Sequence, residues 1–157
     1  MILVTGASGL LGLHLIKNLS LQQQYVRALY NSNQPLLLPG TLADRIEWVQ
    51  GDVLDITQLE SCFENIIQVY HCAAVVSYDE RLHDTMMEIN IEGTANIVNL
   101  CIEKKIQKLL FVSSIAALGK EDPNTFITEK TVWNTTEYSL SQYAVSKQKA
   151  EMEVWRG

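Results

Sequence analysis

The feature that most constrains this chain is a glycine-spaced turn that follows its first apolar residues. Residues 1–4 read Met-Ile-Leu-Val, and Gly6, Gly9 and Gly12 follow with the spacing Gly-x-x-Gly-x-x-Gly. A short apolar run suits a buried parallel strand. Glycines there permit a tight turn, close approach of the backbone to phosphate and close helix–strand packing. The sequence therefore predicts a strand, a turn and a helix whose N-terminal N–H groups face a dinucleotide pyrophosphate.

A second informative segment, Tyr143-Ala-Val-Ser-Lys147, lies near the end of the chain. Residues four apart share one helical face, so the phenol of Tyr143 is expected beside the ammonium of Lys147. A free tyrosine has a pKa of about 10, and a neighbouring cation favours the phenolate. The pair therefore suits proton transfer near neutral pH. The alternative is an exposed helix pair that contributes only about 0.3 kcal/mol.

The order of the motifs resembles the short-chain dehydrogenase/reductase superfamily, in its extended branch of NAD-dependent epimerases, dehydratases and dihydroflavonol-reductase-like enzymes. The Thr-Gly-x-x-Gly-x-x-Gly turn and the Tyr-x-x-x-Lys pair are its first and last motifs. The resemblance covers essentially all 157 residues. Four segments between the two are similar to family motifs: Gly51-Asp52-Val53, His71-Cys72-Ala73-Ala74, Asn90-Ile91-Glu92-Gly93-Thr94 and Phe111-Val112-Ser113-Ser114.

The resemblance implies catalytic roles for four residues. Tyr143 would be the general acid/base, while Lys147 would lower the pKa of the phenol and hold the nicotinamide ribose. Ser114 would orient the substrate carbonyl or hydroxyl, and it is preferred over the adjacent Ser113 because its place in the family spacing matches. Asn90 would either stabilise helix backbone near the site or simply pack.

The resemblance also implies a cofactor site, in which Asp52 would touch the adenine. The hydride chemistry would belong to the cofactor, and the protein would supply position and electrostatics. The expected cofactor-binding residues are Gly6, Ala7, Ser8, Gly9, Leu10, Leu11, Gly12, Tyr30, Asn31, Asp52, Val53, Cys72, Ala73, Ala74, Ser113, Tyr143 and Lys147.

The end of the second expected strand bears on the choice between NAD and NADP. An acidic residue there suits the ribose 2′-hydroxyl of NAD, and a nearby arginine suits the 2′-phosphate of NADP. Residues 26–33 read Val-Arg-Ala-Leu-Tyr-Asn-Ser-Asn, with no acid at the strand tip and no Arg or Lys just after it. Arg27 lies within the strand, and Asn31 and Ser32 could bond either group. A slight preference for NADP is expected, since a missing carboxylate removes a repulsion against phosphate.

Alternation of apolar runs with amphipathic segments predicts an α/β fold, a Rossmann-type doubly wound parallel sheet with right-handed crossovers. Long loops are expected at 31–40 and 121–138. Strands are expected near 1–5, 24–30, 46–50, 67–72 and 107–113, and helices near 10–20, 56–64, 83–104 and 139–155. The first helix is expected to carry an apolar stripe of Leu10, Leu11, Leu13, Leu15, Ile16 and Leu19.

Residues 1–157 are expected to form one NAD(P)-binding domain that is incomplete at its C-terminus. In extended family members the chain would continue into further strands and a smaller substrate domain. The chain is therefore expected to be a piece, a proteolytic remnant or a truncated product of a protein roughly twice as long. In that case the sheet edge beside the strand at 107–113 would be exposed and would favour association.

Composition excludes several other classes of function. The formal net charge is −6, and the absence of a basic patch argues against nucleic acid as a partner. No apolar run approaches the roughly 18–20 residues of a membrane span, and since a strand is expected to start at Ile2, no signal or transit peptide is expected before it. Cys62, Cys72 and Cys101 have no metal-like spacing. They suggest free thiols in a reducing cytosol, with no metal site.

These observations predict an NAD(P)-dependent oxidoreductase that acts on a carbonyl or secondary alcohol of a small molecule. The alternatives are a nucleotide-sugar epimerase or dehydratase, and a non-catalytic NAD(P)-binding module. Leu118 stands where epimerase-like members often carry tyrosine, which favours the reductase-like branch. The 157 residues by themselves are expected to bind cofactor weakly, if at all, and to turn over nothing. A homodimer could form through the helices expected near 83–104 and 139–155. Its interface would use the apolar residues Met86, Ile97, Leu100, Met152 and Trp155, which could equally face the sheet.

Overall fold

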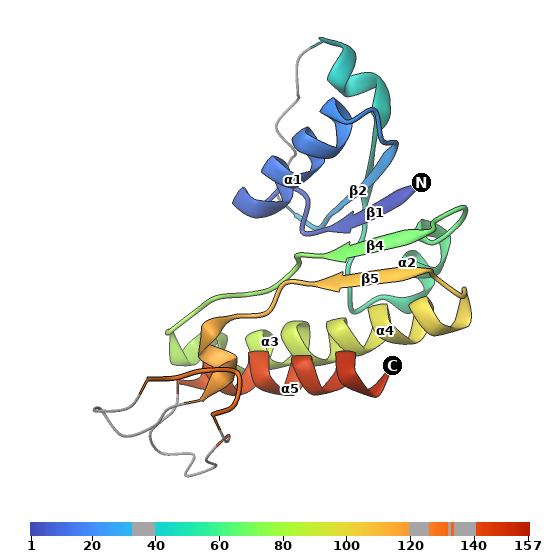
Figure 1. The fold of residues 1–157 in the computed structure, drawn as a ribbon. Helices are drawn as coiled ribbons and strands as arrows, with labels where there is room; N and C mark the ends of the chain where they lie inside the picture. The colour runs from blue at the N-terminus through green and yellow to red at the C-terminus, as the bar shows by residue number, and fades with distance from the viewer. Residues whose placement is uncertain (33–39, 120–125, 132, 134–140) are drawn as a thin grey trace.

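Five parallel strands form one sheet in the order β3-β2-β1-β4-β5. The computed structural model describes residues 1–32, 40–119, 126–131, 133 and 141–157 (Figure 1). The strand order reverses beside β1, as in doubly wound sheets. This confirms the predicted fold class. The strands are β1 (Ile2–Thr5), β2 (Val26–Tyr30), β3 (Ile46–Gln50), β4 (Gln68–His71) and β5 (Lys108–Phe111).

The helices follow the predicted order. The expected helix at 83–104 is one continuous run of three pieces with a π-helical turn in the middle, and the last helix is described from Gln142 onward. Parts of both expected long loops lie outside the described residues. The α-helices are α1 (Leu10–Leu21), α2 (Ile56–Cys62), α3 (His83–Met87), α4 (Gly93–Glu103) and α5 (Gln142–Arg156). Shorter turns are η1 (Gly40–Arg45), η2 (Glu80–Leu82), η3 (Glu88–Glu92) and η4 (Ile115–Leu118).

Side chains alternate across β1, and this builds two cores on opposite faces of the sheet. Leu3 packs with residues of α2 and α4, including Leu59 and Ile97. Val4 packs on the other face with Ile16 of α1 and with neighbouring strands. A strand buried on both faces explains why the first apolar run is continuous rather than alternating.

The predicted stripe on the first helix is only partly correct. Ile16 and Leu19 are buried, but Leu10 is 82% exposed and Leu11 is 53% exposed. Figure 1 shows why: the first turn of α1 lies beyond the ends of the strands, and only the later turns face the sheet.

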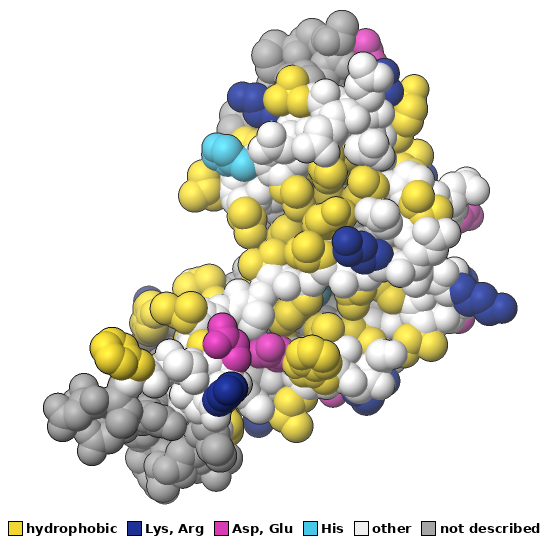
Figure 2. Space-filling model, in the orientation of Figure 1, with side chains coloured by type: hydrophobic (Ala, Val, Ile, Leu, Met, Phe, Trp, Pro, Cys, Tyr) yellow, Lys and Arg dark blue, Asp and Glu magenta, His cyan; other side chains and the backbone are white. Residues whose placement is uncertain are grey.

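One edge of the sheet is open in the part of the chain that the structure describes. β5 pairs only with β4, and Leu110 in its middle is 40% exposed. Figure 2 shows the molecule in the orientation of Figure 1, with hydrophobic side chains gathered in the middle of the view, between the positions of α1 and α5. The expected exposed edge beside the fifth strand is therefore present.

The five apolar residues considered for a dimer interface divide into two groups. Met86, Ile97 and Leu100 are buried within the chain's own fold, whereas Met152 and Trp155 are exposed. Among the described residues, no helix is long and apolar enough to cross a membrane. The same residues contain no group of three or more His, Cys, Asp or Glu side chains that could hold a metal ion.

Candidate cofactor and catalytic site

The glycine turn after β1 packs directly on the segment after β4. Gly6 has a φ of +63°, and a Cβ built there would lie 2.7 Å from the backbone nitrogen of Ala73. A Cβ on Gly12 would lie 2.2 Å from the carbonyl oxygen of Gly6. Only glycine fits these two positions, because every nearby atom belongs to the backbone. At Gly9 the turn opens, since a Cβ there would meet only the Gly6 oxygen at 3.2 Å.

A cavity of about 340 Å³ lies at the carboxyl ends of β1 to β4. It collects residues from the glycine turn, the ends of β2 and β3, and the segment after β4, which are far apart in the sequence. Ligands of doubly wound sheets bind at this end of the strands, where the strand order reverses. Ten of the predicted cofactor-binding residues line it: Gly6, Ser8, Gly9, Tyr30, Asn31, Asp52, Val53, Cys72, Ala73 and Ala74.

Seven predicted cofactor residues are not among the described residues that line this cavity: Ala7, Leu10, Leu11, Gly12, Ser113, Tyr143 and Lys147. Ala7 and Gly12 are buried beneath the turn, and Leu10 and Leu11 are exposed at the start of α1. The cavity also has lining residues that the sequence reasoning missed. Most of them adjoin predicted ones, but Ile89 comes from the π-helical turn, and no sequence signal marks it. The missed residues are Leu29, Gly51, Val75 and Ile89, and the cavity is also lined by Ser32, which was considered as a partner of either 2′ group.

The polar end of the cavity is built around the carboxylate of Asp52. Its Oδ1 accepts from the backbone N–H of Leu54 at 2.9 Å, and its Oδ2 accepts from Asn31 Nδ2 at 3.0 Å. The carbonyl oxygen of Asn31 accepts from Gln50 Nε2 at 3.0 Å. The tips of β2 and β3 are therefore connected, and an acidic group lies beside Asn31, which was expected to be able to bond either 2′ group.

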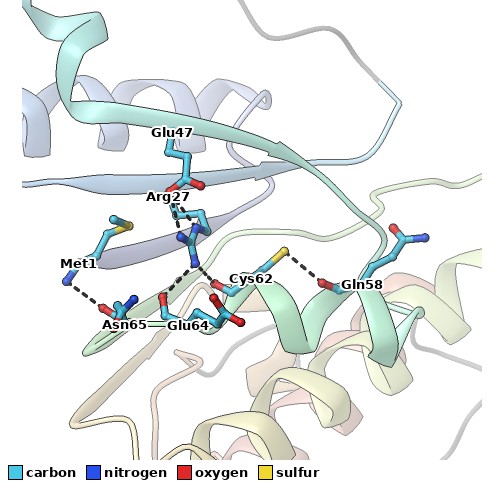
Figure 3. Close-up of polar contacts among 7 residues, drawn as sticks. All are labelled: Met1, Arg27, Glu47, Gln58, Cys62, Glu64 and Asn65. Atoms are coloured by element: carbon cyan, nitrogen blue, oxygen red, sulfur yellow. Dashed lines mark hydrogen bonds and ion pairs between the residues drawn. The ribbon is translucent and has the colours of Figure 1, made fainter.

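Arg27, the cation nearest to the tip of β2 in the sequence, points away from this end of the sheet. Its guanidinium donates to the carbonyl oxygens of Cys62 and Glu64 at 3.0 and 2.9 Å and pairs with Glu47 at 3.0 Å. Figure 3 shows these contacts near Met1, at the amino end of the strands. The described residues that line the cavity include no Lys or Arg.

Lys147 lies buried where α5 meets the end of β5. Its Nζ donates to the carbonyl oxygen of Val112 at 2.8 Å, lies 4.2 Å from the ring centroid of Phe111, and the residue is 2% exposed. Burial lowers the pKa of Lys147 to about 8, although the charges of Glu151 and Cys72 oppose this shift. The backbone N–H of Val112 donates to the carbonyl oxygen of His71 at 3.1 Å, and His71 precedes Cys72, which lines the cavity. These contacts place the ammonium near this wall of the cavity.

Two more of the predicted catalytic residues lie on α5 and just after β5. Tyr143 precedes Lys147 by one turn of α5 and is partly buried. Ser114 follows β5, and its Oγ accepts from the backbone N–H of Ala116 at 3.2 Å, which caps η4. The adjacent Ser113 instead donates to Glu151 Oε2 on α5 at 3.3 Å. The two adjacent serines therefore have different hydrogen-bond partners.

Asn90 lies in the π-helical turn and is 1% exposed. Its Oδ1 accepts from the backbone N–H of Val75 at 2.8 Å, and its Nδ2 donates to the carbonyl oxygen of Val75 at 2.9 Å. The same Nδ2 donates to Ser146 Oγ at 2.9 Å. Asn90 thus holds the cavity wall at Val75 against α5, next to Lys147. The backbone that Asn90 holds at Val75 belongs to the segment after β4, whereas the sequence interpretation named helix backbone near the site.

Comparison with known proteins relates this arrangement to nucleotide-dependent enzymes. A model of the NAD dependent epimerase/dehydratase family matches residues 2–156. Cinnamoyl-CoA reductase 1 of Oryza sativa subsp. japonica is 28% identical over 163 residues, which cover 97% of this chain and 47% of that protein. The chain spans about half the length of the curated relatives it matches.

Solved structures share the fold over nearly the whole chain. The Bordetella bronchiseptica enzyme WbmG in complex with NAD and UDP aligns with a TM-score of 0.82 and 23% identity, covering 98% of this chain and 48% of that one. The UDP-glucose 4-epimerase of Thermus thermophilus in complex with NAD aligns with a TM-score of 0.81 and 25% identity, covering 99% and 50%.

Proposed function

This chain belongs to the NAD-dependent epimerase/dehydratase family, and we propose that it is the cofactor-binding part of an oxidoreductase acting on a carbonyl or secondary alcohol. The observation that carries the proposal is one cavity lined by ten predicted residues, which come from three of the motifs and from the tip of β2. Lys147 on the predicted catalytic helix connects to the same wall, because it bonds to Val112, which bonds to His71 next to Cys72. A nicotinamide dinucleotide fits a cavity with a glycine turn, a helix N-terminus and polar groups at one end.

We propose separate tasks for the three catalytic side chains. Bound cofactor would supply or accept the hydride. Tyr143 then passes a proton to or from the substrate oxygen, and Ser114 orients that oxygen by hydrogen bonding. Lys147 has three N–H donors, of which Val112 takes one. In this proposal the other two would donate to a ribose hydroxyl and to the phenolate, and the ammonium predominates below a pKa of about 8. Asn90 is proposed as a positioning residue.

NAD is the proposed cofactor, rather than NADP. The slight preference for NADP depended on the lack of a carboxylate at the tip of β2. In the structure, Asp52 brings a carboxylate to within 3.0 Å of the Asn31 amide, where it would repel a 2′-phosphate. The sequence from Asn31 to Gly40 contains no Lys or Arg that could offset this repulsion.

Binding of NAD to this chain tests the proposal directly. We expect amide NMR shifts on titration to concentrate in the glycine turn and at residues 72–75, with a Kd of about 1 mM, or about −4 kcal/mol. Gly9→Val is the matched blocking variant. Position 9 has a φ of −75°, which a valine can adopt, but its side chain would occupy the cavity. Shifts scattered over the surface, or unchanged in Gly9→Val, would contradict the site.

Cofactor selectivity is a second expected result. NADP should bind at least about five times more weakly than NAD, because its 2′-phosphate would approach Asp52. Ser32→Arg places a cation at the cavity rim and should reverse the preference, while Ser32→Ala should leave it unchanged. Competition between the two nucleotides measures both. Tighter binding of NADP by the unchanged chain would restore the original preference.

An epimerase or dehydratase is the second candidate, favoured by the matching family model. It would use the same Tyr143 and Lys147 but return the hydride to its substrate. Net production or consumption of NADH with a carbonyl or alcohol substrate, measured on a protein that carries this segment with a substrate domain, separates the two. Binding of NAD without turnover in that protein would favour a non-catalytic module.

A further inference from the structure

Three buried polar side chains connect β1, β4 and α4 beneath the cavity. His71 is the last residue of β4 and is 1% exposed. Its Nδ1 lies 2.7 Å from Thr5 Oγ1, and its Nε2 lies 3.1 Å from Thr94 Oγ1. Thr5 and Thr94 are 0% and 1% exposed. Buried polar groups require partners, and these three residues supply partners to one another.

The outer partners of the two threonines determine where the protons lie. Thr94 donates its only hydroxyl hydrogen to the carbonyl oxygen of Asn90 at 2.6 Å, so it must accept from His71 Nε2–H. Nδ1 of a neutral ring then carries a lone pair and accepts from the Thr5 hydroxyl. The Thr5 oxygen in turn accepts from the backbone N–H of Ala73 at 3.1 Å. The hydrogen bonds run in one direction from Ala73 to Asn90.

The surroundings of His71 keep its ring neutral. Burial lowers the pKa of His71 to about 3, and the nearby charge of Lys147 acts in the same direction. The ring of Phe111 lies beside it at a centroid distance of 5.8 Å. An imidazolium would carry a second N–H donor against Thr5, whose own hydroxyl hydrogen would then lose its acceptor. The one-directional arrangement therefore exists only with the neutral Nε2–H tautomer.

We propose that His71 is a positioning residue for the cofactor cavity and that it acts as the neutral Nε2–H tautomer. We call the hydrogen-bonded series Thr5–His71–Thr94 the relay. At one end of the relay, Thr5 accepts from the backbone N–H of Ala73 and holds it in place. At the other end, Thr94 holds the backbone of Asn90, whose side chain holds Val75. Ala73 and Val75 both line the cavity. The relay therefore fixes the wall segment at residues 73–75 relative to the end of β1 and to the π-helical turn. The effect of the relay on cofactor binding rests on the proposed function. The hydrogen bonds of the relay do not depend on it.

The tautomer is measured first, on the unchanged chain. Nitrogen-15 NMR of the histidine rings at pH 7 should show His71 with Nε2 protonated and Nδ1 unprotonated. His14 is the internal comparison, because its Nδ1 lies 2.8 Å from the carbonyl oxygen of Leu10, which requires a proton on Nδ1. A proton on His71 Nδ1 at this pH would overturn the proposal without any variant having to fold.

Positioning is then tested by removing the far end of the relay. In Thr94→Val the His71 Nε2–H loses its acceptor, and amide hydrogen exchange at Ala73 should become about tenfold faster. Thr94→Ser keeps the hydroxyl and should exchange as the unchanged chain does. The reference amide is Gly51, which bonds to Tyr30 between β2 and β3 at 2.9 Å. Two results would overturn the proposal: equally faster amide exchange at Ala73 and Gly51 in Thr94→Val, or the same acceleration at Ala73 in Thr94→Ser as in Thr94→Val. Either would show that Thr94 contributes only packing.

Titration with NAD separates the relay from the proposed function. The expected tautomer and exchange pattern without any NAD-induced shifts would leave the relay standing and remove cofactor binding. NAD-induced shifts with unchanged affinity in Thr94→Val, at normal Ala73 exchange, would keep the cofactor site and remove the positioning role. About tenfold weaker NAD binding in Thr94→Val, restored in Thr94→Ser, is the result that supports both.

Discussion

Replacing Gly12 with alanine is expected to lower the free energy of unfolding by at least about 3 kcal/mol. The new Cβ would lie 2.2 Å from the oxygen of Gly6 and 2.8 Å from the Cα of Ala7. Neither atom has room to move. Gly6 already packs on Ala73, and the N–H of Ala7 donates to the carbonyl oxygen of Leu29 at 3.0 Å. Relief of the clash would therefore separate α1 from the sheet.

Urea unfolding of the chain measures this effect, with Gly9→Ala as the matched control. Its Cβ would meet one backbone oxygen at 3.2 Å, so a loss below about 1 kcal/mol is expected. The two variants differ by position alone, since both add one methyl group to the same turn. Equal losses at both positions would show that general glycine entropy, rather than close packing at Gly12, governs the turn.

The turn was predictable from the sequence because the need for glycine at its positions depends only on neighbouring residues. Gly6 and Gly12 must lack a Cβ to let one strand, one turn and one helix meet, and their spacing alone reveals that. The five strands and the principal helices were predictable for a similar reason, since short apolar runs alternate with amphipathic segments. The exposure of Leu10 was not predictable from periodicity, because it depends on where the strands end relative to the first turn of α1.

The relay through His71 was beyond sequence reasoning, although its parts are visible there. Thr5 opens the motif that follows β1, and Thr94 belongs to the motif at the start of α4. Each reads as an ordinary polar residue. Only the sheet register places Thr5 opposite His71, and only the π-helical turn directs Asn90 toward Val75. Similarly, the Asp52 carboxylate reaches the tip of β2 from the neighbouring strand, so reading the residues after β2 by themselves missed it.

Acid is expected to destabilise this chain through His71 before its ordinary carboxylates are protonated. The pKa of His71 is about 3 when folded, against an ordinary value of 6.5. The unfolded chain therefore binds this proton at a higher pH than the folded chain does. Stability from the neutral ring is complete above pH 6.5 and is lost as pH falls toward 3. The expected loss is about 1 kcal/mol from pH 6 to 5 and about 2.5 kcal/mol from pH 6 to 4.

Urea unfolding at several pH values, compared with His71→Asn, isolates this contribution. The contribution of His83 to the pH dependence of stability has the opposite sign, because its hydrogen bonds to Asp84 and Gln142 raise its pKa. This contribution is common to both chains and cancels in the difference between them. Carboxylates cancel in the same way. The stability advantage of the unchanged chain should therefore shrink by about 2.5 kcal/mol between pH 6 and 4. A constant difference would mean that His71 accepts a proton in the folded state, which is incompatible with a relay that requires its neutral form.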